Sequence, residues 1–357
     1  MSGLSLWVSS KTWVRDSHGL FDYESEHLCL SNYEARAQGV LFRQDNTIHF
    51  QPGAASSALV TVEQRSSSFE LRLVSEDQED LWTVVKYLSE GSRGMPLLCG
   101  SIIKLGRAMY RVKEINDCKE EAMEEVASDT ASSEGAEAEE CAGREEMVCR
   151  ICYERQQTRD NPLLSPCRCD GTVKYLHLNC LKLWIKSKVT TRQTENSVSY
   201  QWKTIECDIC KLELPLILKT KTAQVSLFEH DRPRGPFLVL EAYPSDRTSL
   251  KSLHVIMMTH GKASICLGRG HDSDVRINDI SVSRCHAMIK FERGQFLIED
   301  NQSKFGTLVK IDSVSLANNE QATVQVGRSL LTLKVQRESE KIGGAQFRQL
   351  PAEEPSS

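Results

Sequence analysis

The stretch from Cys149 to Cys210 constrains the fold of this chain most, because it holds seven cysteines and one histidine at short, regular spacing. Each closely spaced pair can hold one edge of a tetrahedron, so these eight side chains predict two zinc sites. The spacing does not say which pairs share an ion. The order is CxxC, CxC, HxxC and CxxC, formed by Cys149, Cys152, Cys167, Cys169, His177, Cys180, Cys207 and Cys210.

Disulfides are the competing use of these thiols, but they form in oxidising compartments. The N-terminal stretch MSGLSLWVSSKTWVRD lacks the basic and apolar regions of a secretory signal. A chance cluster of buried thiols would not repeat its two-residue spacing. We therefore expect two structural zinc ions, which serve as the core of a segment whose loops contain few apolar residues.

The residues CRIC, then NPLLSPCRCDGTVKYLHLNCLKLWIKS, then CDICK resemble a RING-CH domain, the variant RING of membrane-associated ubiquitin ligases. A PHD finger, which would make the chain a reader of histone tails, has the same ligand order but a tryptophan where this chain has Ile205. The RING-CH resemblance implies a cross-braced fold. It assigns Cys149, Cys152, His177 and Cys180 to one zinc ion, and Cys167, Cys169, Cys207 and Cys210 to the other.

The same resemblance implies a surface that binds a ubiquitin-conjugating enzyme (E2). In RING domains an apolar residue between the first two ligands and a helical tryptophan form that surface, and the matching residues are Ile151 and Trp184, with Ile209 as a lesser candidate. Lys211 stands where many RINGs carry a basic residue that hydrogen-bonds both the E2 and ubiquitin. Every motif cysteine is a predicted ligand, so the resemblance implies catalysis by positioning rather than by a protein nucleophile.

Composition limits the other partners. With 40% hydrophobic and 26% charged residues and a formal net charge of −5, the chain has no basic field for nucleic acid. No apolar run approaches the length of a membrane helix, so we expect a soluble protein with no membrane partner, unlike most RING-CH ligases. The other cysteines are scattered, which suits the cytosol or nucleus: Cys29, Cys99, Cys118, Cys141, Cys266 and Cys285.

A second set of motifs lies towards the C-terminus. SICLGRG, SVSRCHA and DNQSKFGTLV, in that order, resemble a forkhead-associated (FHA) domain, an eleven-stranded β-sandwich that binds phosphothreonine peptides. Phe305 replaces the usual asparagine that contacts the peptide backbone. A sandwich that no longer binds phosphate is the alternative. The resemblance assigns phosphopeptide binding to Arg269, Ser283 and Arg284, and we add Lys304 as a further phosphate contact.

The N-terminal region contains short β-rich segments with no recognisable chemistry. One of them, LGRAMYRVK, is similar to VGRSLLTLK near residues 326–334. Either the β-sandwich is duplicated, with a degenerate FHA-like N-terminal copy, or residues 1–115 form an unrelated β domain.

We therefore expect a mainly β, multi-domain chain with one short helix in the zinc domain. The leading hypothesis is a RING-type E3 ubiquitin ligase whose partners are an E2, ubiquitin and threonine-phosphorylated proteins. The alternative is a non-catalytic scaffold that binds phosphoproteins. The predicted order is a β-rich domain (1–115), an acidic disordered linker (116–146), RING-CH (147–218), a connector (219–236), FHA (237–337) and a disordered tail (338–357).

Overall fold

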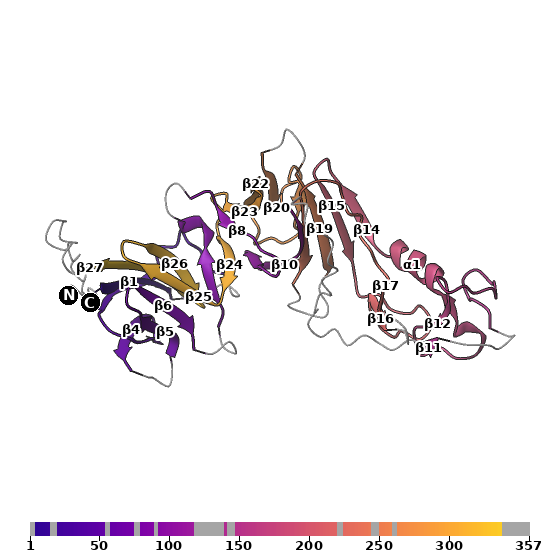
Figure 1. The fold of residues 1–357 in the computed structure, drawn as a ribbon, viewed down its shortest axis with the longest axis horizontal. Coiled ribbons are helices and arrows are strands. Elements are labelled where there is room, and N and C mark those ends of the chain that lie inside the picture. The colour runs from indigo at the N-terminus through magenta and orange to yellow at the C-terminus, as the bar shows by residue number, and fades with distance from the viewer. Residues whose placement is uncertain are drawn as a thin grey trace, which may run out of the picture. The chain divides into compact units, whose positions relative to one another are not determined.

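The chain divides into two compact units in the computed structural model (Figure 1). Unit 1 comprises Met1–Met95 and Gln302–Ser357, and unit 2 comprises Pro96–Asn301. Most of the predicted acidic linker and the whole predicted tail lie outside the described residues. The structure describes residues 4–14, 20–53, 58–74, 79–88, 92–117, 139–140, 147–219, 224–243, 250–258 and 263–337.

Unit 1 is a pair of β-sheets built from both ends of the chain. Within it the strands run in the orders β24-β7-β26-β27-β1-β2 and β25-β6-β5-β3-β4. In Figure 1 the indigo N-terminal strands lie beside the yellow C-terminal ones. Its elements are β1 (Leu4–Trp13), β2 (Leu28–Ala35), β3 (Gly39–Gln44), β4 (Thr47–Pro52), β5 (Ala58–Gln64), β6 (Ser68–Leu73), β7 (Leu81–Val84), the 3-10 turn η1 (Val85–Tyr87), β24 (Thr307–Ile311), β25 (Ser313–Ala317), β26 (Gln321–Val326) and β27 (Ser329–Arg337).

Strand β1 shows why these segments pair. Leu6 and Val8 are buried while Trp7 between them is 38% exposed, the alternation of a strand with one face on a core. Leu6 lies between Ala35 of β2 and Val335 of β27. The core also contains Leu41 and Phe69 from the N-terminal segment and Leu331 and Leu333 from β27. Burying each such side chain contributes about 1.5–3 kcal/mol, so the two ends of the chain stabilise each other.

Unit 2 contains a second pair of sheets and the cysteine-rich segment. Its strands run in the orders β14-β15-β19-β18-β10-β9 and β21-β20-β22-β23. The short β8 (Met95–Pro96) lies at the division between the units. The elements of unit 2 are β9 (Ile102–Leu105), β10 (Ala108–Asn116), β11 (Glu139–Glu140), β12 (Leu163–Ser165), the 3-10 turn η2 (Gly171–Val173), β13 (Leu176–His177), α1 (Leu178–Ser187), β14 (Thr190–Gln193), β15 (Ser197–Trp202), β16 (Ile217–Lys219), β17 (Gln224–Ser226), β18 (Phe237–Ala242), β19 (Lys251–Met257), β20 (Ile265–Gly268), β21 (Val275–Arg276), β22 (Ala287–Glu292) and β23 (Gln295–Asp300).

The two units share one strand order. The run β2-β1-β27-β26 of unit 1 matches β19-β18-β10-β9 of unit 2, and β4-β3-β5-β6 matches β21-β20-β22-β23. The hairpin that completes each run comes from a distant part of the chain. Unit 1 takes β26 and β27 from the C-terminal part, and unit 2 takes β9 and β10 from the N-terminal part. These two hairpins are the segments LGRAMYRVK and VGRSLLTLK. The arrangement favours a duplicated sandwich whose copies have exchanged their closing hairpins.

This grouping differs from the expected order of domains along the chain. The predicted N-terminal domain contributes β10 to unit 2, where it pairs antiparallel with β18 from Tyr110↔Ala242 to Asn116↔Phe237. The predicted FHA domain contributes its last strands to unit 1. Strand pairing is non-local, so a boundary drawn from composition along the chain misses such an exchange.

The cysteine-rich segment is joined to the second sandwich within unit 2. Strand β15, which follows α1, pairs with β19, with Tyr200 opposite Leu253. One continuous apolar cluster contains Leu181 and Ile185 of α1, Tyr200 of β15 and Val255 of β19. The expectation that zinc ions serve as the core of this segment was incomplete, because the segment also has an apolar core. Strand β15, in the long insertion after α1, packs against apolar side chains of the sandwich.

Helix α1 confirms the single short helix expected in the zinc domain. Leu178, Leu181 and Ile185 are buried on one face. Among the described parts of the chain, no helix has the length and apolar character needed to cross a membrane.

Candidate metal centre

A tight turn presents the first pair of cysteines. The Cys149 carbonyl accepts the backbone N–H of Tyr153 at 2.9 Å, and the Cys149 N–H donates to the Glu154 carbonyl at 3.0 Å. Tyr153 takes a left-handed conformation, with φ of 62°. The turn directs the sulfurs of Cys149 and Cys152 to the same side.

A turn of the same shape presents the last pair. The Cys207 carbonyl accepts the N–H of Lys211 at 3.0 Å, and the Cys207 N–H donates to the Leu212 carbonyl at 2.8 Å. Lys211 has φ of 59°. The two CxxC segments are therefore structural equivalents.

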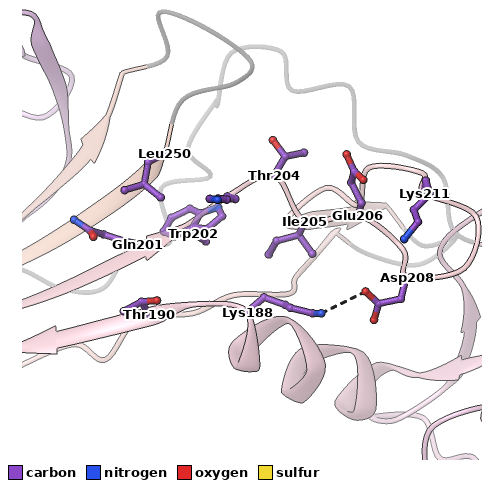
Figure 2. A pocket seen from close by; sticks show the side chains of 11 residues that line it. Lys188, Thr190, Gln201, Trp202, Thr204, Ile205, Glu206, Asp208, Lys211 and Leu250 are labelled. Carbon is purple, nitrogen blue, oxygen red and sulfur yellow. Dashed lines mark hydrogen bonds and ion pairs between the residues drawn. The ribbon is translucent and has the colours of Figure 1, made fainter. Parts of the chain in front are cut away.

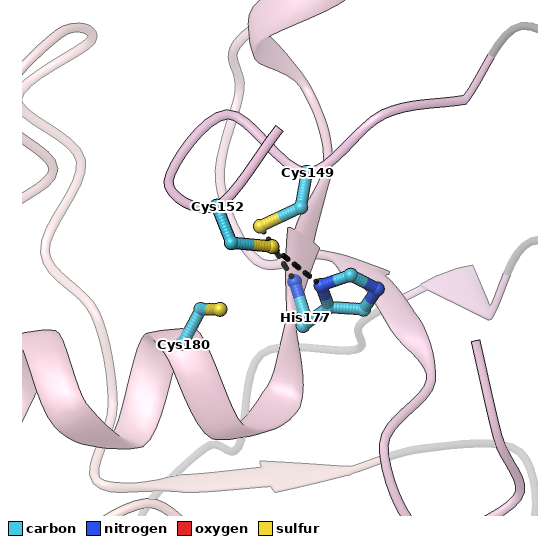
Figure 3. A group of neighbouring side chains, drawn as sticks. All are labelled: Cys149, Cys152, His177 and Cys180. Atoms are coloured by element: carbon cyan, nitrogen blue, oxygen red, sulfur yellow. Dashed lines mark hydrogen bonds between the residues drawn. The ribbon is translucent and has the colours of Figure 1, made fainter. Parts of the chain in front are cut away.

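The first metal-binding group consists of Cys149, Cys152, His177 and Cys180, drawn in Figure 3. Nδ1 of His177 lies 3.2 Å from the Cys152 sulfur, while Nε2 lies 3.0 Å from the Gln156 carbonyl. Donation of the Nε2 proton to that carbonyl leaves the Nδ1 lone pair directed at the sulfurs. The His177 backbone N–H also donates to the Cys149 sulfur at 3.4 Å. This histidine is 3% exposed, so little water competes for its ring.

The second group consists of Cys167, Cys169, Cys207 and Cys210. The sulfurs of Cys169 and Cys207 lie 3.7 Å apart. Zinc–sulfur bonds of about 2.3 Å in a tetrahedron require nearly this separation. Within each group all ligand atoms lie within 4.8 Å of one another.

Both donor sets fit zinc, because closed structural zinc sites take four thiolates, or three thiolates and one imidazole. The structure brings together the same two sets of four that the RING-CH resemblance implies. One set takes the first and third ligand pairs, and the other takes the second and fourth. The Cys and His clusters thus indicate zinc binding, and the cross-brace comes from the fold rather than from the spacing.

The pKa values of the thiols differ within the second group. Burial opposes ionisation of Cys207, but the N–H groups of Cys210 and Ile209 and the Arg150 guanidinium lower its pKa to about 6. Burial raises the pKa of Cys167 to about 12. The two thiols thus differ in how readily they ionise, and because ligand thiols must be deprotonated, binding of a cation releases protons.

The first group shows the same division. Burial again opposes ionisation of Cys149, but N–H donors from Cys152, His177 and Ile151 lower its pKa to about 7. Burial raises the pKa of Cys180 to about 12. Each group thus contains one thiol with a lowered pKa and one with a raised pKa.

The predicted E2-contact residues lie on the surface of this segment. Ile151 and Ile209 occupy equivalent places in the two CxxC turns and are 42% and 55% exposed. The Trp184 indole N–H donates to a carboxylate oxygen of Asp208 at 3.1 Å. The other carboxylate oxygen of Asp208 lies 3.3 Å from the Lys188 ammonium. Asp208, which the sequence did not single out, therefore holds the tryptophan in place.

A groove of about 490 Å³ lies beside this surface (Figure 2). Lys211 and Asp208 line it on one side, while Trp202 and Leu250 line it on the other. The groove joins the last CxxC turn to the base of the β14–β15 hairpin, so it lies where the cysteine-rich segment meets the sandwich strands of unit 2.

Three of the predicted phosphopeptide residues lie in adjoining loops of unit 2. Arg269 and Arg284 are exposed, and Ser283 is half-buried. The Arg269 backbone N–H donates to the Ser283 carbonyl at 2.9 Å. A Cβ on Gly268 would lie 2.1 Å from the Arg284 carbonyl oxygen, so only glycine permits this approach. Nδ1 of the buried His286 accepts the Ser283 N–H at 3.1 Å, so this histidine braces the loop that contains Ser283.

Lys304, the fourth predicted residue, belongs to unit 1. Its ammonium lies 3.1 Å from a carboxylate oxygen of Asp22 and 5.8 Å from the centre of the Phe305 ring. The structure therefore gives Lys304 an internal acidic partner.

Two cysteines that are far apart in the sequence are neighbours in the structure. Cys266 and Cys285 lie next to each other, with Cα atoms 6.0 Å apart. The sequence did not reveal this, because Cys266 lies on β20 and Cys285 in the loop before β22, and only their antiparallel pairing brings them together.

Two families match separate parts of the chain. Residues 149–210 match the RING-variant domain, and residues 265–330 match the FHA domain. The FHA match includes residues assigned to both units.

Curated relatives match about a fifth of the chain. Over 77 residues, 22% of this chain, it is 40% identical to the ERAD-associated E3 ubiquitin-protein ligase DOA10 of Saccharomyces cerevisiae. Over 73 residues, 20% of this chain, it is 40% identical to the probable E3 ubiquitin-protein ligase MARCHF10 of Homo sapiens. The matched region spans only 5% and 8% of these two relatives.

Among solved structures, the crystal structure of Mycobacterium tuberculosis Rv1747 FHA-1 aligns with 29% of this chain and 100% of its own, at 18% identity and a TM-score of 0.15.

Proposed function

We propose that this chain is a RING-type E3 ubiquitin-protein ligase that positions a ubiquitin-loaded E2 and recruits threonine-phosphorylated proteins. The observation that carries the proposal is the surface built around the two metal-binding groups. Ile151 and Ile209 are exposed in the two CxxC turns, and the Trp184 indole is bonded to Asp208 in the second of these turns. Residues 149–210 match the RING-variant domain, and relatives named as ubiquitin ligases match 22% and 20% of the chain.

In the proposed mechanism the protein supplies no nucleophile. Zinc, when bound by the two groups, fixes the loops between the ligands. Ile151, Ile209 and Trp184 bind the E2 by apolar contact, and Lys211 donates hydrogen bonds to carbonyls of the E2 and ubiquitin. The thioester is thereby held in a conformation ready for attack by a substrate lysine, and the rate gain comes from orientation.

Phosphopeptide recognition is assigned to Arg269, Ser283 and Arg284. A phosphothreonine carries a charge of about −1.5 to −2, and two exposed guanidinium groups with a hydroxyl suit its oxygens. We retain Lys304 as a weaker candidate, since a phosphate would have to compete with Asp22 for its ammonium. The proposed location is the cytosol or nucleus, where thiolate ligands stay reduced.

The test of ligase activity is discharge of ubiquitin from a panel of loaded E2 enzymes by the full chain. The full chain is needed because β15 of the cysteine-rich segment pairs with β19. Ile151→Ala should lower discharge about tenfold or more, since an interface hot spot of about 1.4 kcal/mol or more is lost. The matched control is Ile280→Ala, which removes another exposed isoleucine, 81% exposed, from the sandwich.

Zinc content must be equal in all samples. Failure of the zinc-loaded wild type to accelerate discharge from any E2 would favour the alternative, a scaffold that binds phosphoproteins without catalysis.

Phosphopeptide binding is tested separately with a library of phosphothreonine peptides and its unphosphorylated counterpart. Arg269→Ala should abolish the preference for the phosphorylated form. Arg234→Ala, which removes an arginine from the connector, should not. Equal binding of both libraries by the wild type would contradict this half of the proposal.

A further inference from the structure

Arg150 links the two metal-binding groups. It lies between two ligands of the first group in the chain, Cys149 and Cys152, yet its guanidinium lies among the sulfurs of the second. Nη1 lies 3.4 Å from the Cys169 sulfur and 4.0 Å from that of Cys167, and Nη2 lies 3.5 Å from that of Cys207.

Arg150 also fixes the loop that leads to His177, through its side chain and its backbone. Nη1 donates to the Val173 carbonyl at 2.9 Å, and the Arg150 backbone N–H donates to the Tyr175 carbonyl at 3.0 Å. The planar guanidinium offers five donors in a rigid fork, which can satisfy several sulfurs and a carbonyl together. A lysine ammonium offers one point charge and cannot reproduce these contacts.

The negative charge of a metal-bound four-cysteine group explains what these contacts stabilise. Four thiolates around a divalent ion leave a net charge of about −2, which costs free energy in a partly buried site. The Cys169 and Cys207 sulfurs belong to buried residues, so water solvates them poorly. N–H donors directed at the sulfurs offset part of that charge.

The equivalent position in the other CxxC turn serves a different purpose. Arg150 follows Cys149 as Asp208 follows Cys207. Asp208 holds the Trp184 indole, whereas Arg150 extends to the sulfurs of the second group. The next residue after Arg150 is Ile151, a proposed E2 contact, so the arginine also connects the second group to that surface.

We propose that Arg150 is a positioning residue that stabilises metal binding by Cys167, Cys169, Cys207 and Cys210 through donors supplied from the other CxxC turn. The proposal rests on the zinc binding inferred above and is independent of ubiquitin transfer. It assigns a role in metal retention to a side chain that is not itself a ligand.

The test uses Co²⁺ as a spectroscopic probe in the full chain. Thiolate-to-cobalt bands differ between a four-cysteine site and one with three cysteines and a histidine, so the two groups can be titrated separately against a chelator. Arg150→Ala should weaken the four-cysteine group by about 10–100-fold, the range for loss of an outer hydrogen-bond partner, and leave the other group within a few fold.

Two further variants sharpen the result. Arg150→Lys keeps the charge but loses the fork, so its loss should be intermediate; it also answers the question if the alanine variant does not fold. Arg168→Ala removes an arginine from the CxC pair of the same group and should match the wild type.

Equal affinity of the four-cysteine group in the wild type and both Arg150 variants would overturn the proposal, as would an equal loss in Arg168→Ala. A wild type that binds neither Co²⁺ nor Zn²⁺ would instead overturn the zinc assignment itself. Each of these outcomes is read from metal affinity alone, so none depends on whether the chain discharges ubiquitin.

Discussion

Units 1 and 2 use an arginine at matching positions in opposite ways. Arg43 lies near the end of β3 and Arg269 follows β20, the strands that pair with β5 and β22 respectively. Arg43 binds both carboxylate oxygens of Glu79, at 3.0 and 3.1 Å, and is 14% exposed.

Arg269 is exposed, and its Nε donates to the Val282 carbonyl at 3.2 Å. One unit thus uses its arginine in a structural ion pair, and the other leaves its arginine exposed.

The largest expected effect concerns the exchanged hairpins. A segment of residues 237–337 contains the whole predicted FHA domain but lacks β10, the partner of β18. We expect it to remain unfolded, whereas residues 96–301, supplied with Zn²⁺, should unfold cooperatively. Circular dichroism and amide proton dispersion distinguish the two states. A dispersed spectrum from 237–337 would mean that the copies can close without exchange.

Matched substitutions test the difference between Arg43 and Arg269. Arg43→Ala removes the bonds to Glu79, Ser329 and Val326, so it should cost about 3 kcal/mol or more, because hydrogen bonds to charged groups contribute about 1.5–3 kcal/mol each. Arg269→Ala should change stability by less than about 0.5 kcal/mol, the usual range for a surface site. Urea denaturation measures both, and equal costs would remove the distinction.

Acid should weaken unit 2 through His254. Burial lowers the pKa of His254 from 6.5 to about 4, and its ring nitrogens lie 2.8 Å from the Ser199 hydroxyl and 3.1 Å from the Ser252 hydroxyl. The unfolded chain takes up a proton below about pH 6.5 and the folded chain does not. Stability is therefore complete above that pH and falls by about 3 kcal/mol towards pH 4.

In unit 1, β1 instead bonds its neighbours through hydroxyl pairs, Ser10–Ser31 and Thr12–Ser329, which do not titrate. Hydrogen exchange, corrected for intrinsic rates, should show β19 losing protection between about pH 7 and 5 while β1 does not. His254→Gln should remove the dependence in β19. Equal losses in both strands would point to global acid sensitivity instead.

The smallest expected effect is at the junction of β10 and β18. Burial opposes ionisation of Glu241, but Lys113 and Arg111 hold its pKa below the usual 4.5. A lowered carboxyl pKa stabilises the folded state above about pH 4.5, and this is lost as the pH falls through the folded value. Glu241→Gln should therefore cost about 0.5–1 kcal/mol at pH 7 and almost nothing near pH 2–3. A cost that does not change with pH would contradict the ion-pair origin.

Sequence alone determined the local chemistry. The eight ligands, the helix around Trp184 and the motif residues Arg269, Ser283 and His286 follow from residue type and spacing, or from the resemblance that these support. The likeness of LGRAMYRVK and VGRSLLTLK also suggested two copies. Each has a glycine in left-handed conformation, with φ of 60° at Gly106 and 51° at Gly327.

Tertiary structure decided which partners those segments take. Strand hydrogen bonds join residues hundreds of positions apart, as when β1 pairs with β27, and a strand pattern does not name its neighbour. For the same reason the sequence did not predict the contacts of Arg150 with the second metal-binding group or of Arg43 with Glu79. Residue type sets what a side chain can bind, and the packing of distant strands sets what it meets.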